Sequence, residues 1–153
     1  MVKRVVWAND ASPSADRSLP VIRDLVASTG AGLTIAWVSR EWHIGRRPVL
    51  VDDHRELEQG LRRRADELKA EGLSVDLVMT TNDGGHPAQV IADLAESEDA
   101  DLIVAGSHGR GPVTDLLLGS FTSHLLKVAQ RPVLIVPWRP HRTHPESPDS
   151  AAG

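Results

Sequence analysis

The sequence predicts a single α/β domain of three layers, in which helices cover both faces of a five-stranded parallel sheet. Short runs rich in Val, Ile and Leu alternate with longer segments in which apolar residues recur at every third or fourth position. Five such strands alternating with four such helices require a mostly parallel sheet that is buried on both faces. A chain of 153 residues with 41% hydrophobic residues has the size and composition of one folded domain, which we place at residues 1–138.

The first half of the chain contains three of the predicted strands. Residues 2–8 form a Val-rich run that ends in turn-forming residues, as is typical of a buried strand. Ser12 followed by proline indicates a helix start, and helical spacing continues to Gly30, although Pro20 requires either a kink or a helix that begins at Ser18. The elements that follow are a strand at 33–38, a long loop at 39–51, an amphipathic helix at 53–71 and a strand at 73–79.

The second half of the chain repeats the alternation and ends in a tail. It contains a turn at 82–85, a helix opened by Pro87, a strand at 101–105, a helix at 120–129 and a strand at 132–136. Residues 139–153 contain three prolines and no apolar residue larger than alanine, so we expect a disordered tail there.

Composition excludes several classes of function. The formal charge of −4 and the pI near 5.9 argue against nucleic acid as the main partner. The apolar runs have the length of strands and are too short to span a membrane, and the amino terminus meets charged residues too early for a signal peptide. The absence of cysteine excludes disulfides, thiolate zinc sites and cysteine nucleophiles, and it is compatible with the cytoplasmic location that we predict.

The residues most informative about function are the glycines after the strand at 101–105. Gly106 and Gly109 follow this strand directly, and after nine further residues Gly119-Ser120 opens the next helix. Glycine permits positive φ angles and close approach of a ligand, and a helix start offers unpaired N–H donors and the positive end of a dipole. The pattern therefore indicates a phosphate-binding loop. It is neither a Walker A loop nor a dinucleotide fingerprint, and spacing alone leaves a structural loop without a ligand as an alternative.

The pattern of strands along the chain, this glycine pattern and the closing strand at 132–136 together closely resemble the universal stress protein family, over residues 2–136. The resemblance implies the adenine nucleotide alpha hydrolase-like fold. It also implies that the chain belongs to the subgroup with the complete glycine pattern, which binds ATP or another adenine nucleotide such as AMP, ADP or cyclic AMP. Magnesium would be carried by the phosphates, and the protein would act as a nucleotide-dependent module in stress response and signalling.

The resemblance further implies which residues form the site. Asp10, flanked by Ala8 and Asn9, matches the acidic residue that contacts the ribose, where a carboxylate can accept hydrogen bonds from both hydroxyls; a helix cap is the alternative. Val38 matches the position whose backbone reads the adenine edge. The family's positions around the ribose and the phosphates correspond in this sequence to Ala105, Gly106, His108, Gly109, Gly119, Ser120, Phe121 and Thr122. Arg110 is either a phosphate clamp or a solvated side chain, and Ala11 stands where the family commonly has glycine.

No catalytic set and no metal site are predicted. Ser107, His108 and Asp10 have the residue types of a hydrolytic triad, but neighbours on a loop need not point at one another. The segment 43–46 is similar to the start of a nucleotidyl transferase signature, yet it follows the second strand, where that signature does not belong. The resemblance and the apolar edge strand at 132–136 predict a homodimer. Three alternatives stay open: a nucleotide-free dimeric scaffold, a cyclic-AMP binder and a slow ATPase.

Overall fold

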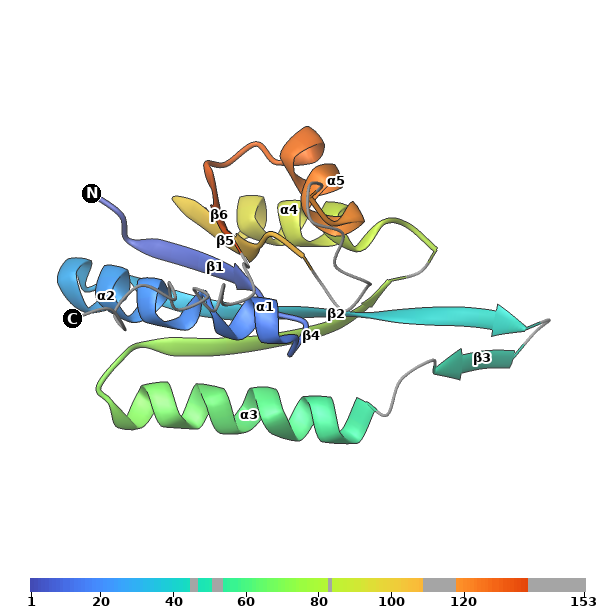
Figure 1. Ribbon diagram of the computed structural model, residues 1–153, viewed down its shortest axis with the longest axis horizontal. Helices are drawn as coiled ribbons and strands as arrows, with labels where there is room; N and C mark the ends of the chain where they lie inside the picture. The colour runs from blue at the N-terminus through green and yellow to red at the C-terminus, as the bar shows by residue number, and fades with distance from the viewer. Residues whose placement is uncertain (45–46, 51–53, 83, 109–117, 138–153) are drawn as a thin grey trace, which may run out of the picture.

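The computed structural model describes residues 1–44, 47–50, 54–82, 84–108 and 118–137 (Figure 1). Within these ranges the elements follow in the order β1 (Arg4–Ala8), α1 (Pro13–Asp16), α2 (Leu19–Thr29), β2 (Gly32–Ile44), β3 (Arg47–Leu50), α3 (His54–Ala70), β4 (Val75–Asn82), α4 (Pro87–Ser97), β5 (Leu102–Gly106), α5 (Ser120–Val128) and β6 (Val133–Val136). No helix in the described ranges is long and apolar enough to cross a lipid bilayer.

Five of the strands form the parallel sheet that the sequence predicts. Their order across the sheet is β4-β2-β1-β5-β6, so the chain winds outwards from β1 in one direction through β2 and β4 and in the other through β5 and β6. Figure 1 shows α2 and α3 on one side of the sheet and α4 and α5 on the other. The three-layer α/β/α fold is therefore confirmed.

The alternation of side chains along β1 explains how both faces of the sheet are covered. Val5 and Trp7 pack with α2 and α3 in one core cluster, whereas Val6 packs with α4 and α5 in the other. All three side chains are fully buried. Because successive side chains of a strand point to opposite faces, a central strand with two buried faces needs an apolar residue at every position. The Val-rich run at the start of the sequence meets this requirement.

The conflict that Pro20 creates in the first helical segment is resolved by a break in the helix. Ser12 caps α1, its hydroxyl accepting from the Ala15 N–H at 3.2 Å, and Pro13 occupies the first turn. A second helix, α2, then begins after Ser18, which places Pro20 in the first turn of that helix. An N–H is not needed for an intrahelical bond at this position, so proline is tolerated there.

The loop expected at 39–51 is wrong in part, because the chain forms an antiparallel hairpin there. Beyond its pairing with β4, the strand β2 continues to Ile44 and pairs with β3 in a register that places Glu41 opposite Leu50. Figure 1 shows this arm projecting away from the helices. Gly45 and Pro48 suggested a loop, but an edge strand tolerates proline, and a short interval between two strands suits a hairpin. Strand β4 likewise begins and ends later than the predicted 73–79.

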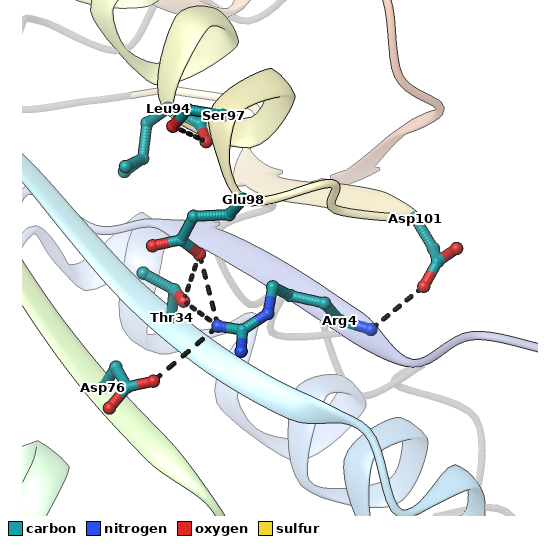
Figure 2. A network of polar contacts seen from close by, with 7 residues as sticks. All are labelled: Arg4, Thr34, Asp76, Leu94, Ser97, Glu98 and Asp101. Atoms are coloured by element: carbon teal, nitrogen blue, oxygen red, sulfur yellow. Dashed lines mark hydrogen bonds and ion pairs between the residues drawn. The ribbon is translucent and has the colours of Figure 1, made fainter.

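A network of polar side chains links neighbouring strands near their amino ends (Figure 2). The Thr34 hydroxyl donates to the Glu98 carboxylate at 2.6 Å, and Arg4 Nη1 lies 3.3 Å from Thr34 Oγ1, 3.4 Å from Glu98 Oε2 and 3.7 Å from Asp76 Oδ2. Thr34 is fully buried, so its hydrogen bonds are the part of the network that would be costly to lose. The contacts join β1, β2, β4 and the segment after α4.

A second contact near the amino ends connects the start of β1 to the start of β5. One carboxylate oxygen of Asp101 accepts the backbone N–H of Lys3 at 2.7 Å and that of Arg4 at 3.0 Å. These two hydrogen bonds, that from Lys3 first, lower the pKa of Asp101 below its ordinary value. The carboxylate therefore stabilises the fold most when it is charged.

Replacing Asp101 with alanine should lower the free energy of unfolding at neutral pH and have little effect in acid. Because the pKa is lower in the folded state, the contribution is fully present above the ordinary value of 3.8 and is lost as the pH falls through the lowered folded value. Urea unfolding of both proteins at about pH 7 and about pH 2.5 measures the difference. Asp66→Ala, at an exposed position of α3, is the control and should show no such dependence. A stability difference for Asp101→Ala that persists unchanged in acid would contradict this account.

Candidate functional site

The sequence-predicted site residues gather where the strand order of the sheet reverses, between β1 and β5. These strands are parallel neighbours with Trp7 opposite Val104, so their carboxyl ends lie side by side. In open α/β sheets, ligands bind at this point, outside the carboxyl ends of the strands. Ala8 ends β1, and Ala105 is the residue before Gly106, which ends β5. Val38, on β2, lies two residues beyond the position that pairs with Ala8.

A tight turn follows β1 and holds the residues expected at the ribose. The Asn9 N–H donates to the Ala36 carbonyl at 2.9 Å, and its side-chain oxygen accepts from the Ala11 N–H at 2.7 Å. One carboxylate oxygen of Asp10 accepts from the Ser12 N–H at 2.9 Å. The helix cap is Ser12, so the capping alternative for Asp10 is wrong. A carboxylate has two acceptor oxygens with several lone pairs, a chemistry that suits it to accept from ligand hydroxyls.

Ala11 has a backbone conformation that favours glycine, with φ at 58°. The turn between Asp10 and Ser12 requires this left-handed geometry, in which a Cβ crowds the backbone. The structure thus explains why glycine suits this position, and it shows that the alanine of this chain stores strain beside the candidate site.

The end of β5 forms the centre of the site through its backbone. The Gly106 carbonyl accepts the Thr122 hydroxyl at 2.8 Å, and the Ser107 carbonyl accepts the Gly119 N–H at 2.9 Å. The Ser107 N–H donates to the Val136 carbonyl at 3.0 Å. Two consecutive residues therefore join β5 to the start of α5 and to the end of β6.

Gly106 is required for a reason different from the one that the sequence suggested. Its φ is not positive, and a Cβ at this position would lie 2.6 Å from Ser14 Oγ and 3.0 Å from the Ser14 carbonyl oxygen. The residue that approaches the glycine closely is thus Ser14 of α1, which the sequence analysis did not single out. Ser14 Oγ also accepts the His108 N–H at 3.4 Å. The available signal was the position of Ser14 in the first turn of a helix that follows a site strand.

The start of α5 supplies backbone donors next to this centre. Gly119 is the N-cap, has φ at −58° and contributes no side-chain cap, and the first helical bond runs from the Ser123 N–H to the Gly119 carbonyl. The amides of residues 120–122 precede that bond and have no acceptor within the helix. Ser120 is exposed, whereas Thr122 is buried and its hydroxyl is used to hold Gly106. Phe121 packs against the core cluster formed with α4 and α5.

Two of the expected site residues, Gly109 and Arg110, lie outside the described part of the chain, as does the tail expected at 139–153. The structure therefore brings together Ala8, Asn9, Asp10, Val38, Ala105, Gly106, His108, Gly119, Ser120, Phe121 and Thr122 along the carboxyl edge of β2, β1 and β5 and the start of α5.

Ser107, which has the residue type of a triad nucleophile, does not present a reactive hydroxyl here. Ser107 Oγ lies 3.0 Å from His108 Nδ1, which is within hydrogen-bond distance. Ser107 is only 5% exposed, however, and a nucleophile must reach its substrate.

The rings of His86 and His124 stack with centroids 3.9 Å apart and join the start of α4 to α5. In the described ranges, no group of three or more His, Asp or Glu side chains is placed to hold a metal ion.

Replacing Ala11 with glycine should raise the free energy of unfolding by about 1 kcal/mol, because the left-handed backbone costs a residue with a Cβ roughly that much. Urea unfolding measures the change. Ala15→Gly is the matched control: Ala15 is buried in α1, so the same substitution should there lower stability. If both variants lose stability, the strain assigned to Ala11 is absent.

Comparisons with known proteins agree with the fold and identify the family of the chain. A sequence model of the universal stress protein family matches residues 1–137. A universal stress protein of Thermus aquaticus, encoded in the 3′ region of a QAH/OAS sulfhydrylase, is 31% identical over 138 residues, which cover 89% of this chain and 99% of that protein. The structure of the universal stress protein UspA from Lactobacillus plantarum shares the fold, with a TM-score of 0.75 at 19% identity over 88% of this chain and 97% of that one.

A further solved structure is a universal stress protein in complex with cyclic AMP. It has a TM-score of 0.66 and is 27% identical, with coverage of 88% of this chain and 97% of that chain. The family match spans nearly the whole described sequence, and the Thermus relative exceeds 30% identity over most of both chains. The chain belongs to the universal stress protein family.

Proposed function

We propose that this protein binds an adenine nucleotide, in the first place ATP, at the carboxyl edge between β1 and β5, and that binding serves as a signal in a stress response. The observation that supports the proposal most is the hydrogen-bonded unit formed by the end of β5 and the start of α5. It ties the start of α5 to the end of β5, the parallel neighbour of β1, and β1 leads into the turn that carries Asp10. A helix N-terminus attracts phosphate, and a carboxylate accepts from ribose hydroxyls, so the two halves suit the two ends of a nucleotide.

In this proposal each group has a separate role. The carboxylate of Asp10 accepts the ribose hydroxyls, with Ala8, Asn9 and Ala105 forming the adjoining strand ends. The backbone of Val38 reads the adenine edge. Gly106 and His108, with Gly109 and Arg110 beyond the described part, surround the ribose and the first phosphate. The start of α5, from Gly119 to Thr122, faces the outer phosphates. Magnesium would be held by the phosphates themselves.

Cyclic AMP is the second candidate ligand, because a relative of 27% identity was solved in complex with it. The two ligands require different parts of the site. Cyclic AMP has a ribose and a single phosphate, so it would use Asp10 and the end of β5 but make little use of the start of α5. ATP would also place its outer phosphates at the exposed Ser120 and the neighbouring amides.

Calorimetric titration of the protein with ATP and magnesium, AMP and cyclic AMP tests the proposal. Asp10→Ala should weaken all three ligands by roughly 10-fold or more, because a hydrogen bond to a charged group is lost. Gly119→Val should weaken ATP more than AMP or cyclic AMP. A φ of −58° and ψ of 159° suit any residue, so the valine should not disturb the backbone but should obstruct the helix start.

Asp24→Ala, at an exposed position of α2, is the control and should leave all affinities unchanged. If the wild-type protein gives no binding with any of these nucleotides up to about 1 mM, a free energy near −4 kcal/mol, the proposal fails and a nucleotide-free scaffold replaces it. Equal losses for all three ligands in Gly119→Val would favour cyclic AMP over ATP.

We also propose that the protein is a homodimer formed through β6. This strand ends the sheet, its pairing within the described residues is with β5, and all four of its apolar residues are only partly buried. An apolar sheet edge of this kind favours pairing with another strand.

Light scattering during size exclusion should therefore give twice the chain mass of 16.6 kDa for the wild-type protein. Val133→Lys should give the single-chain mass, because a charged side chain on an edge strand disfavours pairing. Circular dichroism should show that this variant remains folded. A wild-type protein that elutes as a monomer at tens of micromolar would refute the dimer.

A further inference from the structure

We propose that Ser14 is a positioning residue of the nucleotide site, which holds the end of β5 in the conformation that receives phosphate. The inference rests on the proposed nucleotide binding, and it adds a residue that touches the loop and not the ligand. Ser14 belongs to α1, the short helix that follows the Asp10 turn, whereas the loop that it holds follows β5. It therefore connects the ribose half of the site to the phosphate half.

The contacts of Ser14 are close and buried. Its Oγ accepts the backbone N–H of His108 at 3.4 Å, and only 4% of the residue is exposed. The position of a Cβ on Gly106 would lie 2.6 Å from Ser14 Oγ, 3.0 Å from its carbonyl oxygen and 3.1 Å from its carbonyl carbon. The absence of a side chain at Gly106 thus allows α1 to rest directly on the end of β5.

The neighbouring residues of the loop are held by other elements. Gly106 and Ser107 receive the Thr122 hydroxyl and the Gly119 N–H from α5. The Ser14 contact at His108 is the next one along the chain and comes from the opposite helical layer. A buried N–H without an acceptor is costly, so loss of the Ser14 hydroxyl would free His108 to leave this arrangement.

The expected effect is confined to ligands that carry phosphate. If the loop is no longer preordered, the free energy needed to order it is subtracted from phosphate binding. Adenosine, which has the base and ribose but no phosphate, would bind through Asp10 and Val38 as before. A change in the ratio of nucleotide to nucleoside affinity therefore separates a positioning role from a general loss of stability.

The test uses calorimetric titration of wild-type and Ser14→Ala protein with ATP and magnesium, AMP and adenosine. Alanine is the best helix former, so α1 itself should not be weakened. We expect ATP and AMP to bind roughly 3- to 10-fold more weakly, as is typical for one lost hydrogen bond, and adenosine to change less than about 2-fold. The matched control is Ser28→Ala, on an exposed part of α2, whose hydroxyl bonds the Leu25 carbonyl.

Two titration results would overturn the inference. An unchanged ratio of ATP to adenosine affinity would mean that Ser14 has only a structural role. Tighter ATP binding in Ser14→Ala would mean that the serine competes with phosphate for the His108 N–H.

Amide hydrogen exchange without ligand gives an independent readout. Ser14→Ala should speed exchange in the peptide that covers 106–108, and unchanged exchange would refute the positioning role. If the wild-type protein binds none of the three ligands, the proposed function fails, and the exchange result alone then decides whether Ser14 orders the loop.

A double substitution examines the contact between Ser14 and Gly106 directly. Gly106→Ala alone should lower the melting temperature, because its methyl group meets Ser14 Oγ and the Ser14 backbone. In the Ser14→Ala background the closest of these contacts is gone, so Gly106→Ala should lower the melting temperature less. Strictly additive shifts would show that the two residues do not act on each other.

Discussion

The carboxyl end of β5 is the part of the structure on which the arrangement of the site depends. Three consecutive residues, from Gly106 to His108, exchange hydrogen bonds with α1, α5 and β6 through their backbone groups. Buried peptide groups that lose a partner are costly, so none of these elements can shift alone. The positions of the first helix after β1 and of the last helix before β6 are therefore set by the same short segment.

The site consists more of backbone than of reactive side chains. Asp10 is the one carboxylate among the predicted site residues, Thr122 is used within the protein, and Ser107 is buried. Peptide amides and a helix start stabilise an anion without donating or removing a proton in a reaction. This composition suits the binding of an anion, as the proposed function requires.

Much of the fold could be predicted because the local signals and the tertiary structure agree. The apolar run of β1, the cap at Ser12 and the stop at Gly30 each act over a few residues, and the structure retains them. The arm formed by β2 and β3 could not be predicted, because its pairing depends on cross-strand register, and Gly45 and Pro48 alone suggest a loop. The proposed role of Ser14 could not be predicted from the sequence either. Its partner, Gly106, lies far away in sequence, and only the packing of α1 on β5 brings them together.

The amino ends and the carboxyl ends of the parallel strands have different roles. At the amino ends, Arg4, Thr34 and Glu98 join three parts of the fold, and Asp101 secures the start of β1 (Figure 2). The candidate site lies at the carboxyl ends of the same strands, away from this network. Substitutions at the candidate site can therefore leave intact the polar contacts that hold the opposite ends of the strands together.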